Sequence, residues 1–108
     1  MTTEAEDLAR MIQMDRILEV VQAEFGVTRA QILAPTRSSP DVAWARQVAV
    51  HLCHALMPGV SWSDLGQMFG RDRTTVRHAN QKVQEWRDLE DLDDWLEDME
   101  FVCATPTV

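Results

Sequence analysis

Residues 61–79 read SWSDLGQMFGRDRTTVRHA, and this stretch decides the fold. Its first part, 61–69, opens on a serine suited to cap a helix and places apolar residues at helical spacings. Gly70 predicts a turn, because glycine readily adopts the left-handed conformation that ends helices. Asp72 can then cap a longer helix through 72–87. A short helix, a turn and a longer helix of these lengths predict a helix-turn-helix.

The rest of the chain also has helical spacing. Apolar residues recur every three or four positions in 4–25, 28–33 and 41–57, and again after residue 88. No segment has the alternation of a strand, so we expect an all-α fold: a domain over 1–87, followed by an acidic amphipathic helix and tail over 88–108. The expected apolar positions of the first, fifth and last helices include Leu8, Met11, Ile12, Ile17, Leu18, Val21, Phe25, Val76, Val83, Trp86, Leu89, Leu92, Trp95, Leu96, Met99 and Val102.

The charge is divided unevenly along the 108 residues, whose formal net charge is −8. Residues 28–87 carry eight Lys or Arg against four Asp or Glu, whereas 88–108 carry eight carboxylates and no cation. The acidic total therefore comes largely from the C-terminal stretch. It does not argue against an anionic partner for the middle of the chain.

The start of the 72–87 helix has side chains suited to reading duplex DNA. The major groove admits one α-helix, and residues at the helix N-terminus meet base edges there. Arg73 can donate two hydrogen bonds to guanine, Asp72 can accept from cytosine, and the methyl group of Thr74 can contact thymine. Phosphates would be held by helix N-termini, including the one at Ser61, and by nearby cations. The candidate cationic contacts are Arg46, Arg71, Arg77, His78 and Lys82.

The stretch from Ile17 to Trp86 resembles the C-terminal DNA-binding domain of the bacterial replication initiator DnaA. The residues that carry this resemblance are ARQVAVHL (45–52), SWSDLGQMF (61–69) and GRDRTTVRHA (70–79). It implies a Trp-repressor-like helical domain that binds double-stranded DnaA-box-like sites. Base contacts are implied for Asp72, Arg73 and Thr74, backbone contacts for Arg46, Gln47, Thr75 and His78, and a minor-groove contact for a loop arginine, here Arg37.

The chain also departs from that family. It has Arg73 where the family commonly has His, which favours guanine, and a single glycine, Gly70, where the family usually has two. Its loop retains one cation, Arg37, in place of a basic run. No GxxxxGK[ST] phosphate loop occurs in the chain. We therefore expect a stand-alone cytoplasmic, nucleoid-associated regulator of transcription or replication initiation that uses no nucleotide and has no ATPase activity.

The acidic stretch leaves a second hypothesis open. It can be a solvated helix face, it can fold back over Arg71, Arg73 and Arg77, or it can recruit a basic protein. In the last case the chain is a protein-interaction module whose DNA binding is weak or lost. The N-terminus of the chain is acidic, and no apolar run is long enough to cross a bilayer. Neither a secretory signal nor a membrane partner is therefore expected.

Other kinds of site have weaker support. His51, Cys53 and His54 have a spacing that allows zinc, but no second pair completes a site, so no metal or other cofactor is expected. The two cysteines read as reduced, apolar residues. No nucleophile lies near a base in sequence, so we do not expect an enzyme. The four tryptophans fit core or rim positions better than stacking platforms for single-stranded bases.

Overall fold

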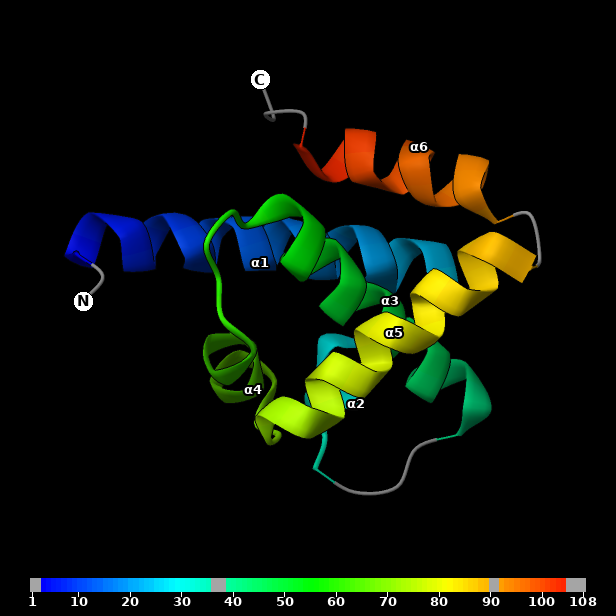
Figure 1. Ribbon diagram of the computed structural model, residues 1–108, viewed down its shortest axis with the longest axis horizontal. Helices are drawn as coiled ribbons and strands as arrows, with labels where there is room; N and C mark the ends of the chain where they lie inside the picture. The colour runs from blue at the N-terminus through cyan, green and yellow to red at the C-terminus, as the bar shows by residue number, and fades with distance from the viewer. Residues whose placement is uncertain (1–2, 36–38, 90–91, 105–108) are drawn as a thin grey trace.

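In the computed structural model, which describes residues 3–35, 39–89 and 92–104, the chain forms an all-α domain. Over those residues the helices are α1 (Glu4–Phe25), α2 (Arg29–Leu33), α3 (Pro40–Leu56), α4 (Trp62–Phe69), α5 (Arg73–Leu89) and α6 (Asp93–Ala104). Figure 1 shows α1 and α6 antiparallel at one side of the molecule, with α4 and the start of α5 at the other. No described helix is long and apolar enough to cross a membrane.

Local capping chemistry explains where the helices begin and end. Thr28 and Ser61 form capping boxes with Gln31 and Asp64, so each side chain satisfies an unpaired backbone N–H of the first turn. Hydrogen bonds from the Ser61 backbone hold the pKa of Asp64 below its ordinary value. At the other ends, α1 stops at a glycine in the left-handed conformation, as does α4.

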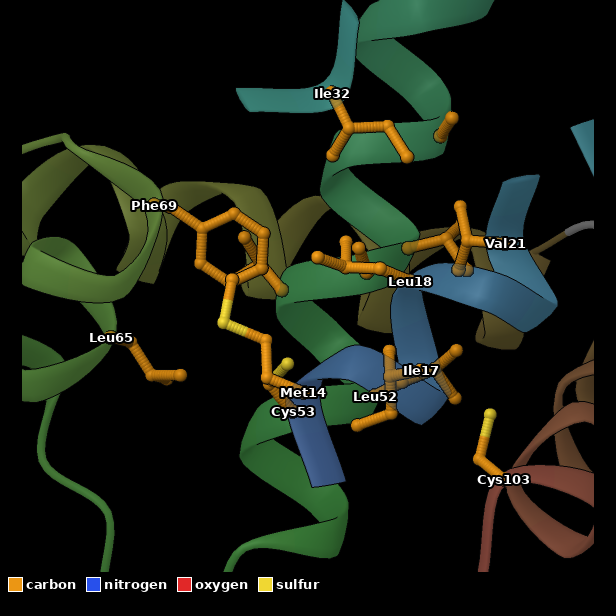
Figure 2. Packing of buried hydrophobic residues seen from close by; sticks show 14 of the residues in the cluster. Met14, Ile17, Leu18, Val21, Ile32, Leu52, Cys53, Leu65, Phe69 and Cys103 are labelled. Carbon is orange, nitrogen blue, oxygen red and sulfur yellow. The ribbon is translucent and has the colours of Figure 1, made fainter. Parts of the chain in front are cut away.

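The core lies around α3, on which side chains from the other helices converge (Figure 2). Ile17 and Leu18 of α1 and Phe69 of α4 are almost fully buried against it, as is Val83 of α5. α6 belongs to the same core, since Leu96, Met99 and Cys103 are buried in it. Both cysteines are free thiols, and burial raises their pKa values. The division of the chain into a domain over 1–87 and an acidic helix and tail over 88–108 stays a prediction.

Several expected apolar positions are not buried. Leu8 and Ile12 are 57% and 61% exposed, because the N-terminal half of α1 extends beyond the helices that pack on its C-terminal half (Figure 1). Leu89, expected in the last helix, is the exposed end of α5. At the end of a helix, a residue is buried only where a neighbouring helix packs over it, so spacing alone does not decide its burial. The exposed members of the predicted stripes are Leu8, Met11, Ile12, Trp86, Leu89 and Val102.

Candidate nucleic-acid interface

The turn between α4 and α5 is held by a close backbone contact. The backbone N–H of Arg71 donates to the Gly66 carbonyl at 2.8 Å, and Gly70 takes φ 64°. A Cβ on buried Gly66 would lie 2.5 Å from the Arg71 carbonyl oxygen. Only glycine at position 66 allows the turn to pack this tightly, so Gly66 fixes where α5 starts.

The first turn of α5 presents the predicted base-reading residues to solvent. Asp72, Arg73 and Thr74 are all exposed. One carboxylate oxygen of Asp72 accepts from the backbone N–H of Thr75 at 2.9 Å, which lowers the pKa of Asp72 and caps the helix. The Arg73 side chain makes no hydrogen bond or ion pair with any residue that the structure describes. It is therefore available to an external partner.

A groove of about 440 Å³ lies on the α4 side of this turn, and we call it the α4–α5 groove. Its lining combines hydroxyl groups at the N-terminus of α4 with two arginines of α5. The N-terminus of α4 therefore faces the same space as the cationic start of α5, an arrangement that favours an anion. The lining residues are Ser61, Trp62, Ser63, Arg73, Thr74 and Arg77.

A second groove, of about 310 Å³, lies between α3 and α5, and we call it the α3–α5 groove. It contains four basic side chains and no carboxylate among its lining residues. Burial, and then repulsion from Arg71, lowers the pKa of Arg46 from its ordinary value, so positive charges are crowded there. An anion entering the groove would relieve that repulsion. The lining residues are Ala43, Arg46, Gln47, Val50, Arg71, Thr75, Val76, His78, Ala79 and Lys82.

Two of these arginines also hold the protein together. The guanidinium of Arg46 donates to the backbone carbonyls of Ile32 and Gln31, and that of Arg71 donates to the carbonyls of Ala34 and Phe69. Arg46 ties the end of α2 to α3, and Arg71 ties the start of the following loop to residues 70–72 between α4 and α5, which we call the recognition turn. Arg37, the expected minor-groove residue, lies outside the described residues.

The acidic helix does not lie over the recognition turn. Asp93 and Glu100 of α6 form ion pairs with Arg87 at the far end of α5, with N···O distances of 2.6 Å each. Of the alternatives for the acidic stretch, folding back over Arg71, Arg73 and Arg77 does not describe α6, whose Asp93 and Glu100 pair with Arg87 instead. The apolar face of α6 packs on α1 and α3, and this fixes its carboxylates at that end.

The residues considered for zinc have other partners. His51 is buried and hydrogen-bonds to Asn80 and Arg87, whereas the ring of His54 is exposed and stacks on Trp62 with centroids 4.2 Å apart. Trp95 donates to Glu24, and Trp44 contacts Trp86. Sequence spacing gave no sign of the His51 contacts, because they join helices far apart in the chain.

The comparisons with known proteins agree with this geometry. A family model described as the bacterial DnaA protein helix-turn-helix matches residues 14–83. The chain belongs to this family. It contains a DnaA-like helix-turn-helix, and the matched segment includes α4, the turn and most of α5.

Individual relatives are all named chromosomal replication initiator protein DnaA. That of Lachnoclostridium phytofermentans is 37% identical over 79 residues, which are 72% of this chain and 17% of the relative. That of Deinococcus radiodurans is 39% identical over 74 residues, 68% of this chain and 16% of the relative. That of Clavibacter sepedonicus is 41% identical over 70 residues, 64% of this chain and 14% of the relative. The DnaA-like chain thus matches less than a fifth of each relative's length.

Proposed function

We propose that this DnaA-like domain binds double-stranded DNA sequence-specifically at DnaA-box-like sites. It acts at the nucleoid, in the cytoplasm, as a regulator of transcription or replication initiation that needs no nucleotide hydrolysis. The start of α5 enters the major groove, where Asp72, Arg73 and Thr74 read bases.

One observation carries the proposal. The exposed Arg73 side chain, which pairs with none of the described residues, lines the α4–α5 groove, and the α3–α5 groove is lined by other residues of the same helix. A duplex presents this pattern of partners, with base edges in the groove and phosphates on both sides. The α4–α5 groove would take one phosphate strand through Ser61 and Arg77. The α3–α5 groove would take the other through Arg46, Gln47, Arg71, Thr75, His78 and Lys82.

Arg46 and Arg71 can hold the protein's own carbonyl groups and contribute to phosphate binding at the same time. Arginine has five donors, and the two carbonyl contacts of Arg71 use only some of them, so Arg71 keeps charge and donors for a phosphate, and Arg46 adds its positive charge. Their fixed position would lower the entropy lost on binding. Arg37 follows Ala34 by three residues, and we propose that it enters the neighbouring minor groove.

Selection from a random duplex library tests the proposal. We expect enrichment of one motif containing a guanine that depends on Arg73, and binding of a DnaA-box duplex above a scrambled duplex. Recovery of no motif, with equal binding to all duplexes, would contradict sequence specificity. Absence of duplex binding together with binding to a basic peptide would favour the interaction module instead.

Lys82→Ala is expected to weaken binding to every duplex by roughly threefold and to lower the salt slope by about 0.9, because one phosphate contact is lost. Lys82 lines the α3–α5 groove and forms no hydrogen bond or ion pair with the described residues. Fluorescence anisotropy at several salt concentrations measures both effects. Gln84→Ala, also exposed on α5, is the control and should leave both values unchanged. A loss confined to one sequence would show that Lys82 reads a base.

A further inference from the structure

We propose that His51 and Asn80 are positioning residues for DNA recognition: their partly buried hydrogen bond sets where α5 sits on α3, and so how both helices meet the duplex. The inference rests on the proposed function and adds two residues that touch no DNA. It is carried by the one buried polar side chain among the described residues, His51, which is 2% exposed.

The ring of His51 has both nitrogens engaged by α5. Nδ1 lies 2.8 Å from Oδ1 of Asn80, and Nε2 lies 3.0 Å from a guanidinium nitrogen of Arg87. Because a guanidinium can only donate, Nε2 must accept, and the proton must be on Nδ1, which donates to Asn80. The neutral ring is thus fully satisfied by two residues of one neighbouring helix.

α6 completes the arrangement. A guanidinium nitrogen of Arg87 also donates to Glu100 at 2.6 Å, and Asp93 accepts from Arg87 on its other side. Arg87 is therefore held by two carboxylates of α6 while it donates to His51 of α3. This network joins three helices at the end of α5 that is remote from the recognition turn.

The α3–α5 contact decides the shape of the proposed phosphate site. Gln47 comes from α3, and Thr75 and Lys82 come from α5, yet all line the same groove. Apart from the two contacts of His51 with Asn80 and Arg87, the buried side chains between these helices are apolar, for example Val50 and Val76, and apolar attraction has little directionality. A hydrogen bond does depend on direction. The bond from His51 to Asn80 can therefore set the position of α5 along its axis and its rotation relative to α3, both of which apolar packing leaves adjustable.

The same bond makes the position of α5 dependent on pH. Burial lowers the pKa of His51, so the folded protein favours the neutral ring. The charged or titratable groups facing His51 are His54 on α3, Arg87 on α5 and Glu100 on α6. In a protonated ring Nε2 would become a donor opposite the guanidinium of Arg87. Nε2 and Arg87 would then compete for Glu100, whose Oε1 lies 3.6 Å from Nε2.

The direction of the pH effect follows from proton binding. Because the unfolded chain binds a proton at His51 more readily, this contribution to stability is present above about pH 6.5 and is lost as pH falls through the lower folded pKa. DNA affinity should lose the His51 contribution over the same range.

Three variants separate a positioning role from a merely stabilising one, with DNA affinity and the unfolding temperature measured on each. Asn80→Ala leaves the buried Nδ1–H unsatisfied and should lower both stability and affinity, the latter by about tenfold. Asn80→Asp keeps an acceptor and should retain affinity within about twofold. The double variant His51→Leu with Asn80→Leu replaces the pair with apolar groups, so it should recover stability but not affinity. Gln81→Ala, exposed on α5, is the control.

The outcomes distinguish this inference from the function on which it rests. Absence of duplex binding by the unaltered protein would contradict both. If that protein binds but Asn80→Ala binds equally well, or if affinity returns together with stability in the double variant, the positioning role is wrong. A pH profile gives a second readout. Because the two proteins differ only at positions 51 and 80, effects of pH on the rest of the surface cancel in the ratio of their affinities. The affinity ratio of the unaltered protein to the double variant should fall between about pH 7 and 5; a constant ratio would contradict the inference.

Discussion

Arg73→Ala is expected to cost about 1–3 kcal/mol of binding free energy on the preferred duplex, because a bidentate arginine contact to guanine has about this value. The variant should also accept other bases at one position of the site. The expected stability change is small, since Arg73 is exposed and its side chain has no partner in the described part of the chain. Anisotropy titrations against the selected duplex and its three variants at the guanine position measure both effects.

Arg73→Lys is the matched control, because it keeps the positive charge but loses the planar fork that makes two parallel hydrogen bonds. It should bind all four duplexes with similar affinity, above that of Arg73→Ala. If Arg73→Ala weakens every duplex equally, Arg73 contacts phosphate and does not read a base. The guanine preference would then have to come from another residue.

Gly66→Ala is expected to lower DNA affinity by about tenfold or more and to cost about 1–3 kcal/mol of folding free energy, as overpacking does. The added Cβ would meet the Arg71 carbonyl oxygen at 2.5 Å and the Arg73 backbone nitrogen at 3.3 Å. Both are backbone atoms of the turn, so the start of α5 must move. Chemical denaturation and DNA titration on the same preparation measure the two losses.

Gly70→Ala is the control that destabilises the protein without displacing α5. Gly70 has φ 64°, so an alanine there is strained by about 1–2 kcal/mol, but its Cβ meets nothing within 4 Å. We therefore expect Gly70→Ala to lose stability while keeping DNA affinity, measured where both variants are folded. Similar affinity losses in the two variants would show that Gly66 acts through stability alone and not by placing α5.

The helix-turn-helix is predictable from sequence because its determinants are local. Helices expected over 61–68 and 72–87 are observed at Trp62–Phe69 and Arg73–Leu89, since a capping residue or a left-handed glycine decides where a helix begins or ends within a few positions. The exposed start of α5 follows from the same pattern, because its polar and apolar faces separate at helical spacing.

Contacts between helices could not be predicted in this way. Ile12 fits the apolar stripe of α1 but is exposed, because no neighbouring helix reaches it. Arg46 and Arg71 were expected at phosphates, but nothing in their spacing indicated the carbonyl oxygens, distant in sequence, that hold both. His51 depends on Asn80, 29 positions away. Periodicity indicates which face a residue occupies, but it carries no information about which side chain stands opposite.

The central claim is that the start of α5 reads base edges from the major groove, and a modified duplex tests it most directly. Replacing the selected guanine with 7-deazaguanine removes the N7 acceptor in the major groove and leaves the phosphates and base pairing intact. Our account predicts that this change weakens binding by the unaltered protein about tenfold and leaves binding by Arg73→Ala unchanged. Equal sensitivity of both proteins, or no loss in either, would contradict it.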